Sequence, residues 1–63
     1  MFVKLNLIDG DEILVNINHI HYVMVDPDSG RTLVVMDDGK TVLSITENFN
    51  QATLKLKYEG IVK

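Results

Sequence analysis

The chain has 63 residues, of which 46% are hydrophobic, and its formal net charge is −3 at pH 7. This length allows one small domain over residues 1–63, and the hydrophobic content argues against disorder. The acidic balance makes nucleic acid an unlikely partner, because affinity for phosphate groups needs clustered Lys and Arg side chains.

The absence of cysteine excludes disulfides and thiolate zinc sites. A chain of this size buries barely enough apolar surface to offset the entropy cost of ordering it. Self-association is the simplest remaining way to bury more apolar surface. We therefore expect a homo-oligomer, or docking on another protein. Because no segment has the pattern of a secretory signal or a membrane helix, we expect a cytoplasmic protein with no membrane partner.

The first two predicted strands form an antiparallel hairpin. Residues 3–7 alternate apolar and polar side chains, the period of a half-buried strand. Asp9-Gly10 follows and is a strong hairpin-turn signal, since Gly accepts a positive φ without steric cost. Residues 12–18 then place three apolar side chains on one face: Ile13, Val15 and Ile17.

Three more strands are expected after a break at residues 16–19, where Asn side chains compete with ladder hydrogen bonds. They lie at residues 20–25, 31–37 and 40–45, separated by the loop 26–30 and by the turn Asp38-Gly39. The run Leu33-Val34-Val35-Met36 is continuously apolar. It suits a strand covered on both faces, either inside the domain or at a subunit contact.

The C-terminal segment has two interpretations. Asn48 as N-cap and Gln51 three residues later predict a helix with Phe49, Ala52 and Leu56 on one face and Gly60 after its end. Strict alternation over residues 53–58 predicts a strand instead. We favour the helix, because residues 50–52 have mediocre strand propensity.

The predicted fold is therefore mainly β: a small, bent five-stranded antiparallel sheet or half-open barrel, of SH3-like or Sm-like size, with a short C-terminal helix. Five side chains are expected on the faces opposite the core: Ile8, Leu14, Val34, Met36 and Leu43. A five-stranded sheet hides both faces only if it curls into a barrel or if a partner covers it. This pattern predicts oligomerisation or docking on a protein.

The sequence has few candidate metal ligands, mainly aspartates and two histidines. The aspartates fall in predicted turns, and Asp commonly starts a turn. The segment Asp26 to Gly30 is not a calcium-binding loop, because its glycine is at position 5 and such a loop needs it at position 6. His19 and His21 share a face if they lie on one strand, but no spacing supplies a third ligand. We predict no metal site.

Catalysis has no support in the sequence. Ser29 and Ser44 are the only serines, and neither lies in a Gly-x-Ser-x-Gly context. There is no glycine-rich phosphate loop, and so small a domain has little room for a water-excluding pocket. We predict a protein that is not an enzyme, with no catalytic residues and no cofactor.

The only basic cluster is at the end of the chain, where Lys55 and Lys57 lie close to Tyr58 and Lys63. On a small barrel such a cluster would contact RNA phosphates while the tyrosine stacks on a base, or would contact a partner protein. Terminal lysines are also ordinary solubilising residues. Lys55, Lys57 and Tyr58 are therefore the candidate contact residues, with solvation as the simpler explanation.

The turn residues resemble those of a known family. Asp9-Gly10, Pro27-Asp28, Gly39-Lys40 and Glu47 before a closing helix are similar to the pattern of the small bacterial FlbD/SwrD flagellar proteins, as are Asn16, Ile20 and Val23. The resemblance implies a link to motility and no catalysis. A second, fold-level likeness is to Sm-like barrels, which assemble into rings and often bind RNA.

The sequence thus predicts a non-catalytic protein-interaction or self-assembly module. The alternative is an Sm-like RNA-binding ring.

Overall fold

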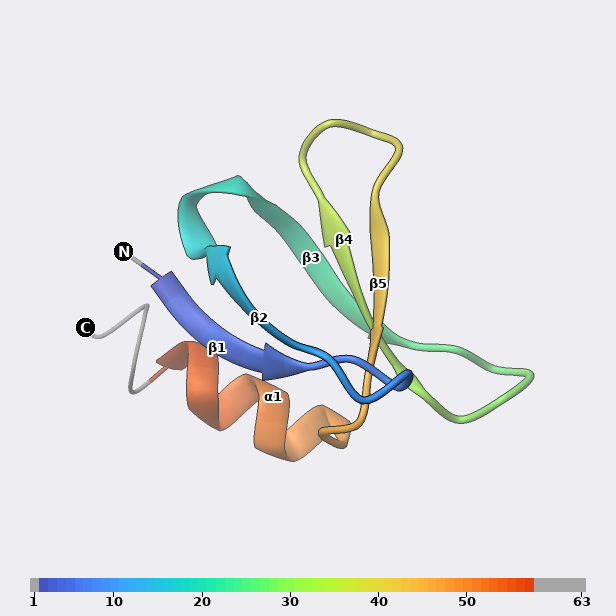
Figure 1. The fold of residues 1–63 in the computed structure, drawn as a ribbon. Helices are drawn as coiled ribbons and strands as arrows, with labels where there is room; N and C mark the ends of the chain where they lie inside the picture. The colour runs from blue at the N-terminus through green and yellow to red at the C-terminus, as the bar shows by residue number, and fades with distance from the viewer. Residues whose placement is uncertain (1, 58–63) are drawn as a thin grey trace.

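The computed structural model describes residues 2–57 of the chain. It contains five strands, a short 3-10 helix and one α-helix (Figure 1), in this order: β1 (Phe2–Asn6), β2 (Glu12–Asn16), η1 (Ile17–His19), β3 (Ile20–Val25), β4 (Thr32–Met36), β5 (Val42–Ile45) and α1 (Phe49–Lys55). The predicted mainly-β fold with a short C-terminal helix is confirmed, and the strand positions agree with those expected to within a few residues.

The strands form two antiparallel sheets. One is the hairpin β1–β2, in which Val3 pairs with Val15, and the other has the order β3-β4-β5. The sheets meet where β1 ends beside β5: the Ile8 N–H donates to the Ser44 carbonyl at 3.1 Å and the Thr46 N–H to the Asn6 carbonyl at 2.8 Å. The sheets are not closed into a barrel. We predicted either a bent open sheet or a half-open barrel, and the structure has an open arrangement that is divided into two sheets.

Aspartate side chains hold the turns, as predicted. The side chains of Asp9, Asp26 and Asp38 each accept a hydrogen bond from the backbone N–H two residues later. The Asp38 carboxylate also accepts from the Thr41 hydroxyl, and these hydrogen bonds lower the Asp38 pKa from 3.8 to about 2. Gly39 has a φ of 75°, a conformation that a side chain would disfavour.

The expected break between the second and third strands is the helix η1. The Asn16 side chain accepts a hydrogen bond from the Asn18 N–H, so the chain turns there instead of extending β2. This short turn carries the chain from the two-stranded sheet into β3 (Figure 1).

The C-terminal segment is helical, and the strand interpretation is wrong for residues 53–57. Asn48 and Gln51 form the predicted capping box, in which each side chain accepts a hydrogen bond from the backbone N–H of the other residue. Ala52 and Leu56 are buried as expected, whereas Phe49 is 41% exposed. Gly60 lies outside the described residues. Within residues 2–57 no helix is long and apolar enough to cross a bilayer.

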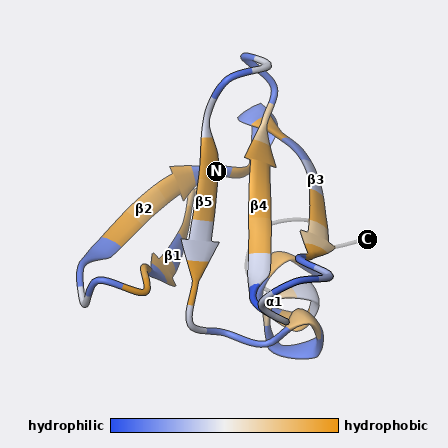
Figure 2. Ribbon diagram, turned by 90° about the vertical axis from the view of Figure 1, so that its right-hand side faces the viewer, coloured by the Kyte–Doolittle hydropathy of each residue, from blue (hydrophilic) through white to orange (hydrophobic). Residues whose placement is uncertain are grey.

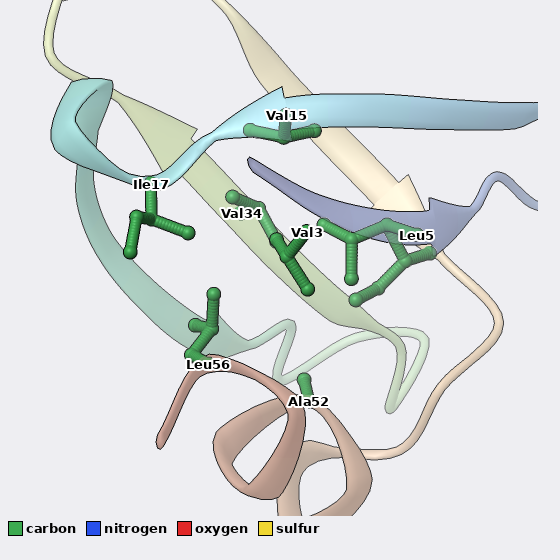
Figure 3. Close-up of a cluster of buried hydrophobic side chains, with 8 residues drawn as sticks. Val3, Leu5, Val15, Ile17, Val34, Ala52 and Leu56 are labelled. Atoms are coloured by element: carbon green, nitrogen blue, oxygen red, sulfur yellow. The ribbon is translucent and has the colours of Figure 1, made fainter. Parts of the chain in front are cut away.

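The core lies between the two sheets and is closed by α1. Figure 3 shows side chains from β1, β2, η1, β4 and α1 converging on one cluster. Its buried members are Val3, Leu5, Val15, Ile17, Val34, Ile45, Ala52 and Leu56. Because every element except β3 supplies a buried member, the cluster holds the two sheets and the helix together.

One expectation about the faces was wrong. Val34 is fully buried, and Met36 and Leu43 pack against the core, although we expected all three on faces opposite to it. The continuous apolar run of β4 has no alternation from which its inward side can be recognised. Ile8 and Leu14 are exposed, as expected, with 46% and 69% of their surface accessible.

We expect Val34→Ala to lower the free energy of unfolding by about 2–3 kcal/mol, because the lost methyl groups leave a cavity at the centre of the core. Chemical denaturation followed by circular dichroism measures this change. Leu14→Ala is the matched control, since an exposed side chain contributes at most about 0.5 kcal/mol. Equal effects of the two substitutions would contradict the position of Val34 at the core centre.

Candidate interaction surface

The register of the three-stranded sheet defines its two faces. Val34 on β4 pairs with Val23 and Leu43, so these three side chains lie on one side of the sheet. Val34 is buried and the other two pack against the core, so this side faces inward. Because side chains alternate along a strand, the neighbouring residues lie on the opposite side.

The opposite side is an apolar surface, which we call the outer face. It consists of two cross-strand rows, Tyr22–Val35–Val42 and Met24–Leu33–Ser44. None of the six side chains is charged and five of them are apolar or aromatic. Tyr22 is 48% and Val42 53% exposed, and the other four are half-buried. In Figure 2 the ribbon of β4 is mostly orange, the colour of hydrophobic residues, and the ribbon of β5 is orange with pale stretches.

A bulge shapes one border of the outer face. The register of β3 against β4 shifts between Ile20 and Tyr22, so His21 is an extra residue in the ladder. The His21 ring lies edge-on against the Tyr22 ring, with 5.1 Å between their centroids. This contact supports Tyr22, the one aromatic side chain among the six of the outer face.

His19 and His21 do not lie on one strand. His19 is in η1 rather than on a strand, and its Nδ1 lies 3.2 Å from Oδ2 of Asp37 in an exposed pair. His21 contacts Tyr22 instead. Within residues 2–57 no three His, Cys, Asp or Glu side chains are grouped so that they would hold a metal ion.

Two of the three predicted contact residues, Lys55 and Lys57, lie within the described part of the chain. Lys55, at the end of α1, donates to the Lys4 carbonyl at 3.0 Å and forms an ion pair with Glu47. Lys57 is exposed, and Tyr58 lies outside the described residues. The structure thus gives Lys55 a place in the packing of the helix against β1.

Glu47 is the centre of this polar contact. Its side chain is only 8% exposed and accepts hydrogen bonds from the backbone N–H and the side-chain amide of Asn6, in addition to Lys55. Burial alone would raise the pKa of Glu47, but the Lys55 ammonium and the backbone N–H groups outweigh it and lower the pKa from 4.5. The pattern around Glu47 gave no sign of this role, since its partners are 41 and 8 positions away.

Comparisons with known proteins add nothing to this geometry: no family model matches the chain, and no curated protein or solved structure is significantly similar to it. The likeness to the FlbD/SwrD proteins therefore stays a prediction.

We expect Glu47→Gln to lower the free energy of unfolding by about 1–3 kcal/mol at pH 7, because Lys55 loses its ionic partner. A carboxylate whose folded-state pKa is lowered stabilises the fold fully above its ordinary pKa of 4.5, and this stabilisation is lost as the pH falls through the folded value. The difference between the two proteins should therefore shrink below pH 4.5, as urea denaturation at a series of pH values would measure.

Glu12→Gln is the control, because it removes the same charge from an exposed position on β2. It should change stability by no more than about 0.5 kcal/mol at pH 7. A Glu47→Gln protein whose deficit stays constant from pH 7 to pH 3 would contradict an ionised Glu47 in the fold.

Proposed function

We propose that the protein is a non-catalytic protein-interaction module that self-associates through the outer face of β3-β4-β5. The observation that carries this proposal is the uncharged outer face itself, in which two cross-strand rows place five apolar or aromatic side chains at the surface. Contiguous apolar patches on a small protein mark interaction sites, because each one leaves apolar area in water.

The size of the chain supports the same conclusion. Its accessible surface is 4308 Å², close to the roughly 4,100 Å² that scaling gives for this mass. The fold thus buries what is usual for its length, and proteins of this length are marginally stable. Covering the outer face would add apolar burial without lengthening the chain.

A second copy is the partner that the outer face suits best. An isologous contact places the same surface on both copies, so an uncharged sheet face is complementary to itself. Each copy carries a net charge of −3, so two copies repel each other. Because the outer face has no charged side chain, a contact through it does not bring like charges together. Sheets commonly pack face to face in this way, about 10 Å apart.

The expected dimer is weak. Six side chains are far fewer than the roughly 20–30 residues that each partner contributes to an interface of standard size. Association should therefore depend strongly on protein concentration, with a monomer at low concentration.

The RNA-binding ring is the less favoured alternative. Lys55, one of its three candidate residues, is held by Glu47 and by the Lys4 carbonyl. Residues 53–57 are not a strand, whereas a strand there would make the chain more similar to an Sm-like barrel. Self-association requires neither feature.

We expect Val35→Lys to abolish self-association, because it places a charge at the centre of one row of the outer face. The substitution reduces the net charge from −3 to −2, so stronger repulsion between whole molecules does not account for a loss. Sedimentation velocity over a concentration series measures the effect, and circular dichroism verifies the fold.

Leu14→Lys is the matched control. It makes the same charge change at an exposed apolar position of the other sheet, where it should leave self-association intact. A wild-type protein that stays monomeric at millimolar concentration, or a Leu14→Lys protein that fails to associate while Val35→Lys still does, would overturn the proposal.

A further inference from the structure

The two-stranded sheet has one covered edge and one open edge. On the edge of β1 that faces away from β2, the Asn6 N–H donates to Glu47 and the Asn6 carbonyl accepts from Thr46. The Lys4 carbonyl on the same edge accepts from Lys55. No strand among residues 2–57 pairs with the far edge of β2. In Figure 2 β2 lies at the left of the molecule, with no other strand beyond it.

The register shows which backbone groups of β2 point toward this open edge. At the hairpin turn the Leu7 N–H donates to the Asp11 carbonyl at 2.7 Å, so these two residues are a hydrogen-bonded pair. Such pairs alternate with non-hydrogen-bonded pairs along an antiparallel ladder. Glu12 and Leu14 therefore belong to non-hydrogen-bonded pairs, and their N–H and C=O groups point away from β1. Their partners on β1 point the other way, toward α1 and the chain after β5, where their contacts are found.

The open edge has little protection. The outward N–H and C=O groups of Glu12 and Leu14 have no hydrogen-bond partner among residues 2–57. Both residues are exposed, Leu14 by 69%. Natural edge strands are usually protected by a proline, a bulge or several charged side chains. β2 has no proline and no register shift, and Glu12 is its only charged residue, whereas the edge strand β3 has its bulge at His21.

The charge around the open edge indicates the kind of partner. Asp9, Asp11 and Glu12 are exposed at the turn and at the start of β2, and Lys4 is the only basic residue within residues 2–16. A second copy would bring another acidic hairpin against this edge, and the two would repel each other. A segment that carries lysine or arginine would be attracted. The edge therefore suits a basic partner better than a second copy.

We propose that the edge of β2 binds an extended, basic segment of another protein, which adds to the β1–β2 sheet as an antiparallel third strand. Leu14 would exchange two backbone hydrogen bonds with the residue opposite it. An apolar side chain at that position would lie beside the Leu14 side chain, and a lysine two positions later would lie beside Glu12. This edge is separate from the outer face of β3-β4-β5, so the proposal does not depend on self-association.

The test is an NMR titration of the 15N-labelled protein with the peptide acetyl-Thr-Val-Leu-Val-Lys-Thr-Lys-amide. We expect saturable shifts of the amide signals of residues 11–15. Hydrogen exchange of the Glu12 and Leu14 amides should become slower, because both N–H groups gain an acceptor. A contact made by side chains alone would not slow this exchange.

Two control peptides separate backbone pairing from charge. The same peptide with an N-methylated leucine lacks the N–H that would donate to the Leu14 carbonyl, and it should bind about tenfold more weakly or worse. The peptide with glutamate in place of both lysines should bind about threefold more weakly or worse. Equal binding of the N-methylated peptide, or no response to any of the three peptides, would overturn the proposal.

Substitutions in β2 locate the contact. Leu14→Pro removes an outward N–H that makes no hydrogen bond to β1, and it should abolish binding, whereas Leu14→Ala keeps this N–H and should weaken binding only about threefold. Glu12→Lys should reverse the charge preference, so that the glutamate peptide binds better than the lysine peptide; this outcome tests the site even where Leu14→Pro prevents folding. Glu12 and Leu14 amide signals that shift with protein concentration in the absence of peptide would show a second copy on the edge and would contradict the proposal.

Discussion

The fold depends on one buried carboxylate. Glu47 lies between β5 and α1 in the chain, and it binds the Asn6 backbone at the end of β1 and the Lys55 ammonium at the end of the helix. These contacts fasten α1 to the hairpin at the place where the two sheets also meet through backbone hydrogen bonds. A buried carboxylate without such partners would be costly, so its partners and the position of the helix are coupled.

Fixing the helix there determines which surfaces are left uncovered. Figure 3 shows Ala52 of α1, and Leu56 directly after the helix, directed at the same cluster as Val3 and Val34, so the helix closes the side of the core between the sheets. The chain has one α-helix in its described part, and that helix is used on the inner side. The outer face of β3-β4-β5 is therefore left to solvent or to a partner, and this is why the apolar run of β4 is covered by its own chain on only one side.

The turns and the helix cap were predictable because their physics is local. The aspartate of each predicted Asp-Gly turn bonds a backbone N–H two residues later, and the Asn48–Gln51 capping box spans three positions. The inward side of β4 was not predictable in the same way. Its residues are all apolar, so only their pairing with β3 and β5 distinguishes Val34 from Val35. The contacts of Lys55 were not predictable for a similar reason, since the Lys4 carbonyl that it binds lies on β1, 51 positions earlier in the chain.

The amino-acid sequence by itself determined the mainly-β class, the positions of the five strands, the turns between them and the start of the helix, because these follow from the side-chain period and from hydrogen bonds over two or three residues. Only the tertiary structure decided that the strands divide into two sheets, which face of the three-stranded sheet the rest of the chain leaves uncovered, and that Glu47 is buried among polar partners. Those features come from contacts between residues up to 41 positions apart, and residue order carries no local signal for contacts at that range.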